Sequence, residues 1–199
     1  MSLGKQSKIL TDKQVKIMLL HLGTTRMPVR NQLIFLLSAK SGLRAKEVSQ
    51  LKWSMVVNSD GVVGNAIHLT NNASKGKSGR VIPLNKDVKG LLVRLFKDES
   101  ERFEFDINSS FVIRTERSNS TSAQSIVNMF ASWYSDLGFV GCSSHSGRRT
   151  FITNLSKKIS LVGGSLRDVQ SLVGHKNLQT TQRYIEVDTD CQRKLVDLV

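Results

Sequence analysis

Six residues in separate parts of this chain have side chains suited to handling a phosphate ester. Arginine and lysine bind phosphate oxygens, histidine moves protons near neutral pH, and a tyrosine hydroxyl can act as a nucleophile. Together they would supply a metal-free phosphodiester transfer, in which a DNA strand is cut and rejoined. In chain order the six residues are Arg44, Lys75, His145, Arg148, His175 and Tyr184.

The spacing of these residues is more specific than their types. His145 and Arg148 are spaced as His-x-x-Arg. Gly174 precedes His175, and Tyr184 follows that histidine by nine residues. Other chemistries find less support in the sequence. No paired ligand spacing suggests a zinc site, and the acids do not cluster as in a two-metal nuclease. No Gly-x-x-x-x-Gly-Lys-Ser/Thr loop exists to bind a nucleotide. We therefore expect no metal and no cofactor.

The chain is strongly basic, with 29 lysines and arginines against 16 acids and a net charge of +13. Such a charge attracts polyanions, so we expect double-stranded DNA as the partner, with a solubilising surface or rRNA binding as the alternatives. Two cysteines, Cys142 and Cys191, are too few for a disulfide framework, and no apolar run approaches a membrane span. The expected location is the cytoplasm, in association with the nucleoid and with no membrane partner.

The hydrophobic pattern predicts a mainly α fold with a small antiparallel three-stranded β-sheet, in the α+β class. Strands are predicted at 53–57, 66–70 and 81–84, with a basic hairpin tip between the last two and a charged loop at 97–110. Helices are predicted from residue 12, over 28–41, from residue 45, and over 87–96, 122–137, 149–159, 165–173 and 178–184. We expect a single domain, 5–199, with Met1–Gly4 left over from expression cloning.

Taken in order, the arginine, the lysine, His-x-x-Arg, Gly-His and the tyrosine resemble the catalytic domain of the tyrosine recombinases, the phage integrase family. The resemblance runs from about Lys5 to the C-terminus. It implies a site-specific recombinase or integrase that works through a 3′-phosphotyrosine intermediate, without metal or ATP, since the phosphotyrosine keeps the energy of the broken bond. It also implies self-association, as a tetramer, on paired DNA sites.

The resemblance implies a role for each of the six residues. Tyr184 would attack the scissile phosphate. Arg44 and Arg148 would hold its non-bridging oxygens. Independently of the resemblance, Glu47 lies three residues after Arg44 and is a candidate partner that either neutralises the first guanidinium or orients it. Lys75, on the β-hairpin, would protonate the 5′-oxygen that leaves.

The two histidines complete the implied site. His145 would handle protons at the nucleophile or the phosphate, and His175 would hydrogen-bond to the phosphate. Lys77 competes with Lys75 for the acid role, and Arg149 keeps the choice of Arg148 open. Weaker DNA contacts are expected from Lys77, Arg80, Arg149 and Lys176.

The chain departs from the family pattern in two ways. Where the family often has His-x-Leu-Arg-His, this chain has Gly147 in place of leucine and Arg149 in place of the second histidine. Nothing before Lys5 corresponds to the N-terminal core-binding domain that completes a clamp around DNA in many members. We therefore expect a catalytic domain alone, with the core-binding domain absent and with weak DNA binding.

Two other functions stay open. A type IB topoisomerase-like enzyme would use the same chemistry to relax supercoils as a monomer. A non-catalytic DNA-binding protein on the same fold would need the charge but no nucleophile. The apolar tail after Tyr184 bears on the first alternative, because it would either dock on a neighbouring subunit or cover the chain's own core; its members are Leu195, Val196, Leu198 and Val199.

Overall fold

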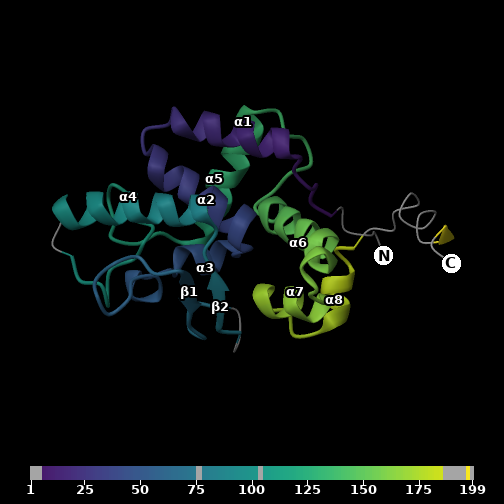
Figure 1. Cartoon of the computed structure of the whole chain (residues 1–199). Helices are drawn as coiled ribbons and strands as arrows, with labels where there is room; N and C mark the ends of the chain where they lie inside the picture. Colours follow the sequence, from purple (N-terminus) through teal and green to yellow (C-terminus); the bar gives the residue numbers. More distant parts are fainter. Residues whose placement is uncertain (1–5, 75–77, 103–104, 186–195, 198–199) are drawn as a thin grey trace.

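The computed structural model describes residues 6–74, 78–101, 105–185 and 196–197, and the backbone of Arg102. Over these residues the chain is mainly helical, with one two-stranded sheet (Figure 1). The α-helices are α1 (Asp12–Gly23), α2 (Pro28–Ser41), α3 (Ala45–Ser49), α4 (Lys86–Arg102), α5 (Ala123–Asp136), α6 (Ser146–Lys158), α7 (Leu166–Val173) and α8 (Leu178–Gln182). Two short 3-10 helices are η1 (Trp53–Met55) and η2 (Ile159–Val162), and the strands are β1 (Ala66–Leu69) and β2 (Arg80–Pro83).

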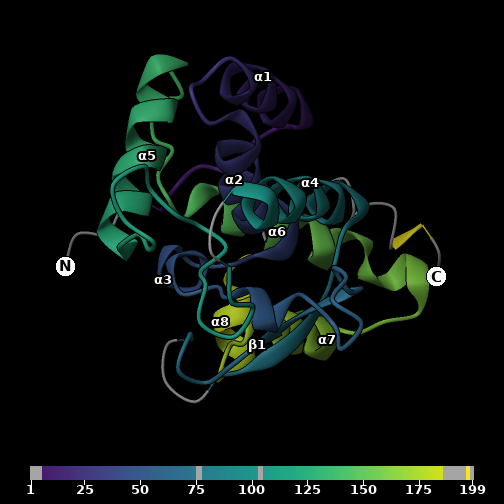
Figure 2. The ribbon, with the colours of Figure 1, turned by 90° about the vertical axis from the view of Figure 1, so that its left-hand side faces the viewer.

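Helix α2 is the central element of the larger part of the molecule. Nine of its 14 residues are buried, among them the continuous apolar run from Leu33 to Leu37. Pro28 occupies its first turn, and Gly42 ends it with a positive φ of 66°. Helices α1, α4, α3 and α6 all pack against α2 (Figures 1 and 2). The packing against this buried helix therefore fixes the positions of α1, α3, α4 and α6.

The apolar side chains form two clusters. The larger one contains most of the core, including Phe35, Trp53 and Phe130. The smaller one joins α6 and α7 through Ile152, Val169 and Val173. In Figure 1 the elements around this second cluster, α6 to α8, are drawn in green to yellow beside the rest of the fold. The contact of α6 with α2 and the contact of α7 with β2 join the two parts.

The sheet has two strands, so the predicted third strand at 53–57 is wrong. Residues Trp53–Met55 form a 3-10 turn instead. Trp53 turns its ring into the core, where its centroid lies 5.1 Å from that of Phe96 and 5.9 Å from that of Phe105. The segment forms only single bridges at its ends among the described residues, from Lys52 to Phe111 and from Val57 to Val63. Its apolar residues serve this packing rather than a strand ladder.

The other predicted elements are present with shifted ends. Helix α4 continues through residue 102, so the first part of the predicted loop 97–110 is helical. One reason is the ion pair of Glu99 with Arg114, at 2.9 Å, which ties the last turns of α4 to the following chain. Helix α6 begins at Ser146, three residues before the predicted start at 149. Every helix in the described residues is too short or too polar to cross a membrane.

The close approach of α6 to α2 depends on Gly147. A β-carbon added there would lie 2.6 Å from Ser38 Oγ and 3.3 Å from the backbone nitrogen of Ala39. Because Ser38 belongs to the buried centre of α2, neither side can move away easily. Glycine at this position, where the family often has leucine, therefore fits the packing of this chain.

We expect Gly147→Ala to lower the free energy of unfolding by about 1–3 kcal/mol, because the added methyl group overpacks the α2–α6 contact. Gly90→Ala is the matched control, since an added β-carbon meets nothing within 4 Å at that position of α4. That control should be neutral or slightly stabilising, because alanine favours helix more than glycine does. Urea unfolding of both variants makes the comparison, and equal midpoints would contradict the packing argument.

Candidate active site

The site lies where the two parts of the fold meet, between the start of α3, the base of the hairpin, and the α6–α8 region. Arg44 is the N-cap residue of α3. Arg80 opens β2 and faces Leu69 across the sheet. Arg148 lies in the first turn of α6, His175 follows α7, and Tyr184 follows α8. Residues far apart in the sequence are therefore assembled at one junction.

A buried carboxylate, Glu47, holds two arginines. Its side chain is 0% exposed. Arg44 donates to Glu47 Oε1 at 3.0 Å, and the backbone N–H of Arg44 donates to Oε2 at 2.9 Å. Arg80 donates to both oxygens, from Nη1 at 3.0 Å and from Nη2 at 3.1 Å. The predicted pairing of Arg44 with Glu47 is thus confirmed, and a second arginine shares the same carboxylate.

This ion-paired group keeps Glu47 charged. Burial alone would raise the pKa of Glu47, but the hydrogen bonds and charge of Arg80, and then those of Arg44, hold it below the ordinary value. Arg80 also donates from Nε to the carbonyl of Leu172 at 2.8 Å, and its side chain is only 6% exposed. Arg80 therefore connects the hairpin to both α3 and α7.

Arg148 is buried and is held by carbonyl groups rather than by an acid. It is 4% exposed. Its guanidinium donates from Nη1 to the carbonyl of Gly42 and from Nη2 to that of Val173, the latter at 2.7 Å. Burial, followed by the charge of Arg44, lowers the pKa of Arg148 below its ordinary value. A buried cation in this position favours an anionic ligand.

His175 and Tyr184 form a stacked pair. Their ring centroids lie 5.5 Å apart with an interplanar angle of 24°. His175 Nδ1 lies 3.0 Å from Thr181 Oγ1, and the carbonyl of Tyr184 accepts a hydrogen bond from Thr153 Oγ1 at 3.1 Å. The tyrosine ring also packs against the α6–α7 cluster. The structure thus places the candidate nucleophile beside His175 and near enough to Arg148 to influence its pKa.

The neutral form of His175 is favoured. Burial first, and then the arginine charges led by that of Arg148, lower the pKa of His175 to about 4. The imidazole is therefore uncharged at neutral pH. An uncharged imidazole can donate one hydrogen bond and accept another, which suits it to contact a phosphate oxygen while it faces Thr181.

The remaining predicted residues are less closely joined. His145 is exposed at the N-cap of α6, where its Nδ1 lies 3.5 Å from Ser144 Oγ. Arg149 is half-buried on α6, and Lys176 is exposed directly after His175. Lys75 and Lys77 lie outside the described residues. The structure thus brings together Arg44, Arg80, Arg148, His175 and Tyr184.

The joined residues form a site with excess positive charge. The described residues of the site include three guanidinium groups and one carboxylate, which is bound by Arg44 and Arg80 but not by Arg148. A phosphate would supply the missing negative charge, and arginine's planar fork matches its oxygens. Among the described residues, no group of three or more His, Cys, Asp or Glu side chains could hold a metal ion.

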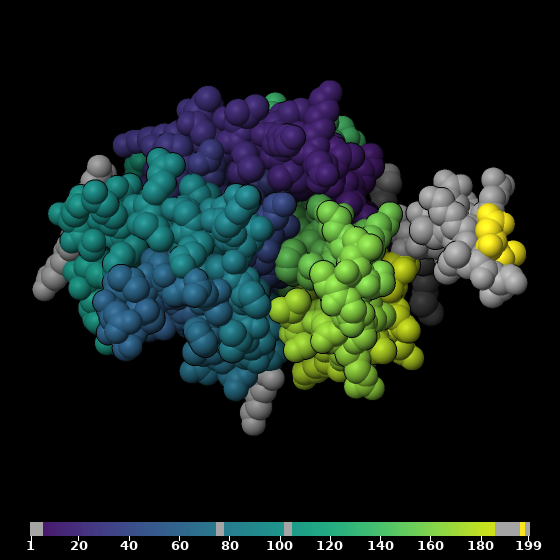
Figure 3. Space-filling model, in the orientation of Figure 1, coloured from purple at the N-terminus to yellow at the C-terminus, as the bar shows by residue number. Residues whose placement is uncertain are grey.

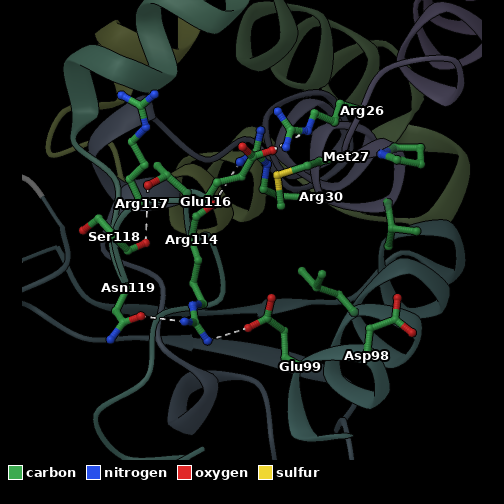
Figure 4. A pocket seen from close by; sticks show the side chains of 14 residues that line it. Arg26, Met27, Arg30, Asp98, Glu99, Arg114, Glu116, Arg117, Ser118 and Asn119 are labelled. Carbon is green, nitrogen blue, oxygen red and sulfur yellow. Dashed lines mark hydrogen bonds and ion pairs between the residues drawn. The ribbon is translucent and has the colours of Figure 1, made fainter. Parts of the chain in front are cut away.

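A second cavity, of about 640 Å³, has a different character (Figure 4). It lies between the start of α2, the end of α4 and residues 114–119, and it contains none of the predicted site residues. Its charges are largely paired within the cavity wall. Arg114 pairs with Glu99 at 2.9 Å, and Arg26 pairs with Glu116 at 2.8 Å. This cavity is therefore a poorer site for phosphate.

Three contributors to the site were not predicted as such from the sequence. Arg80 was predicted only as a weaker DNA contact, and its pairing with Glu47 spans 33 residues of chain. The hydroxyl of Thr181 orients the ring of His175 through a hydrogen bond with Nδ1. Gln170 donates from Nε2 to the carbonyl of His175 at 3.0 Å and so fixes the turn that carries the histidine. Local spacing gives no signal for the long-range pairing of Arg80 with Glu47.

Comparisons with known sequences agree with this assembly. The sequence model of the Phage integrase family matches residues 8–190. Tyrosine recombinase XerA of Thermococcus kodakarensis is 29% identical over 187 residues, which cover 94% of this chain and 61% of that protein. Tyrosine recombinase XerD of Rickettsia conorii is 27% identical over 204 residues, which cover 96% of this chain and 63% of that protein. The chain thus spans about three fifths of the length of these curated relatives.

Solved structures share the fold. The Tn1549 transposon integrase in complex with a circular intermediate DNA matches with a TM-score of 0.76 at 18% identity, over 98% of this chain and 66% of that one. The XerH site-specific recombinase bound to palindromic difH substrate, in a post-cleavage complex, matches with a TM-score of 0.75 at 19% identity, over 98% of this chain and 53% of that one. The mainly α fold with a small antiparallel sheet is the fold of these proteins.

We expect the Arg80–Glu47 pair to be strongly coupled in stability. Arg80→Met leaves a buried carboxylate with fewer partners, and Glu47→Leu leaves two arginines without their acid, so each single change should cost about 3–5 kcal/mol. The double variant Arg80→Met/Glu47→Leu should lose clearly less free energy of unfolding than the two single variants lose in sum, because both charges of the pair are removed together. Urea unfolding of the four proteins measures this coupling, and simple additivity would refute it.

We also expect His175 to make stability depend on pH. The free energy of unfolding of the wild-type chain, relative to His175→Gln, should fall as the pH is lowered from about 6.5 to about 4. The sign follows because in this range the unfolded chain binds a proton on His175 while the folded chain does not. Urea unfolding at a series of pH values tests this, with His68→Gln as the control for loss of an exposed histidine. If the difference in free energy of unfolding between the wild type and His175→Gln did not change with pH, the low pKa of His175 would be contradicted.

Proposed function

The chain belongs to the phage integrase family, and from this premise we propose that it cuts and rejoins DNA strands through a covalent bond to Tyr184, as a site-specific recombinase or integrase. One observation carries the proposal. The buried Arg148 and the two arginines bound to Glu47 meet at one position, the junction of the two parts of the fold, where three cations face a single carboxylate beside a stacked histidine and tyrosine. A DNA phosphate in that position would complete the charge balance and lie within reach of a nucleophile.

The arginines would act on the phosphate oxygens. As the tyrosine oxygen attacks phosphorus, negative charge grows on the two non-bridging oxygens. Arg44 and Arg148 would meet that charge with hydrogen bonds whose donors are already held in place by Glu47 and by backbone carbonyls. Removing one such contact typically lowers the rate by ~10²–10³. His175 would add a further hydrogen bond as a neutral donor.

Proton transfers would complete the exchange. The Tyr184 hydroxyl loses its proton as the new phosphorus–oxygen bond forms, and the 5′-oxygen gains one as the old bond breaks. We assign the second transfer to Lys75, with Lys77 as its competitor, and proton handling at the nucleophile or phosphate to His145. The reverse attack by the 5′-hydroxyl rejoins the strand and frees Tyr184. Neither step requires ATP. Side-chain cations would stabilise the phosphate charge that a metal ion stabilises in metal-dependent nucleases.

The partners follow from this chemistry. We propose double-stranded DNA as the substrate, and self-association as a tetramer on paired sites. The solved relatives described above include proteins in complex with DNA. A cytoplasmic, nucleoid-associated location would suit such a substrate. We further propose that residues 5–199 form one catalytic domain, and that Lys77, Arg149 and Lys176 add weaker contacts to the DNA backbone.

One alternative shares the chemistry. A type IB topoisomerase-like enzyme would relax supercoiled DNA as a monomer, whereas a recombinase would depend on paired specific sites. Incubation with a supercoiled plasmid of unrelated sequence separates the two, because relaxation without paired sites would favour the topoisomerase. A non-catalytic DNA-binding protein would do neither.

The central prediction concerns Tyr184. We expect wild-type protein to form a covalent adduct with nicked duplexes drawn from the DNA that flanks the gene, in excess EDTA and without nucleotide. Tyr184→Phe should form none, because it lacks the attacking hydroxyl, while its affinity for DNA stays nearly unchanged. Denaturing gels and peptide mapping of the adduct give the readout.

A matched control is Tyr134→Phe. Tyr134 is buried in α5, and its hydroxyl has no hydrogen-bond partner among the described residues, so the change removes an oxygen without disturbing the site. This variant should be captured as well as the wild type. Equal capture of Tyr184→Phe, or a strict magnesium requirement, would contradict the mechanism.

A further inference from the structure

A basic groove opens beside the phosphate site. It has a volume of about 440 Å³, and its two walls are the base of the hairpin and α7 with the turn that follows it. The hairpin and α7 meet on the face shown in Figure 3, and Figure 1 shows β2 beside α7. The lining residues are Ser78, Gly79, Arg80, Arg167, Gln170, Ser171, Gly174, His175 and Lys176. Arg80 and His175 belong to both the groove and the proposed active site, so the groove is continuous with it.

The lining of this groove carries cations and no carboxylate. Its charged residues among those described are Arg80, Arg167 and Lys176. Arg80 is balanced by Glu47, whereas Arg167 and Lys176 are exposed and lie in no ion pair between described residues. The acid next to Arg167 in sequence is engaged elsewhere, because Asp168 accepts hydrogen bonds from the backbone and hydroxyl of Ser165. The accessible charge of the groove is therefore positive.

Two glycines allow the walls of the groove to pack closely against neighbouring groups. A β-carbon on Gly79 would lie 2.8 Å from the carbonyl of Leu69, and one on Gly174 would lie 2.9 Å from Arg80 Nη1. Gly174 also has a positive φ of 63°. Because neither position has a side chain, the carbonyl of Leu69 can lie against Gly79 and the guanidinium of Arg80 against Gly174, and this close packing fixes the two walls of the groove.

These features point to a phosphodiester. From them we infer that the groove binds a backbone phosphate that flanks the scissile one on the same DNA, with Arg167 as its principal contact and Lys176 beside it. Arg80 and His175 line the groove and also belong to the proposed active site. Because successive phosphates of one strand lie only ~3.4 Å apart along the helix axis, a strand bound in that site would bring a neighbouring phosphate to the groove. The inference rests on the proposed function and adds a contact that the sequence motifs do not include, namely Arg167.

The first test is the salt dependence of DNA binding. Fluorescence anisotropy with a short duplex of random sequence gives the affinity at a series of NaCl concentrations. Loss of one phosphate contact in Arg167→Gln should weaken binding about tenfold and reduce the slope of log K against log salt by about 0.9. Arg94→Gln, an exposed arginine on α4, is the matched control and should keep the wild-type slope. A slope for Arg167→Gln equal to that of Arg94→Gln would overturn the inference.

The second test blocks the groove without removing a charge. Ser171 is exposed on α7 and lines the groove, so Ser171→Trp should fill the space and weaken DNA binding at least tenfold. Ser135→Trp, at an exposed position of α5, controls for the added indole. Unchanged binding of Ser171→Trp would also overturn the inference. Failure of the proposed function is a separate result, because it would appear as loss of the covalent adduct in the wild-type chain.

Discussion

The buried carboxylate of Glu47 is the interaction on which the site depends. It holds Arg44 on its own helix and Arg80 on the hairpin, and Arg80 in turn reaches the carbonyl of Leu172. One acid thus links α3 to the hairpin, and Arg80 extends the link to α7. A buried charge of this kind is costly unless it is fully paired, so the loss of either arginine would leave an uncompensated charge in the interior. The arginines are consequently in place before any ligand arrives.

The packing of α6 against α2 provides the second constraint. Arg148 can reach the carbonyls of Gly42 and Val173 only if α6 lies close to the end of α2. Gly147 permits that approach, and the ring of Phe151 lies over Gly42, where an added β-carbon would come within 2.5 Å of it. The larger core thus determines where the smaller α6–α8 part sits. The geometry of the proposed phosphate site is in this sense a property of helix packing.

Much of this arrangement was predictable from local sequence. The His-x-x-Arg spacing singled out Arg148, although the helix that carries it was predicted to begin one residue later, at 149. The three-residue separation predicted the contact of Arg44 with Glu47. The pairing of Arg80 with Glu47 was not predictable, because 33 residues separate them and only the folded chain brings them together. The third strand was predicted wrongly, since an apolar run around Trp53 fits a strand or a buried turn equally well. The chemical roles of all six site residues stay predictions.

The carbonyls that hold Arg148 belong to the ends of two helices. Gly42 is the C-cap of α2, and Val173 is the last residue of α7. The C-terminal end of a helix carries a partial negative charge from its aligned peptide dipoles, so two such ends stabilise the guanidinium without a full counter-ion. An incoming anion therefore has no carboxylate to displace from Arg148. The same helix ends that let a charged arginine stay buried also leave its positive field available to the phosphate.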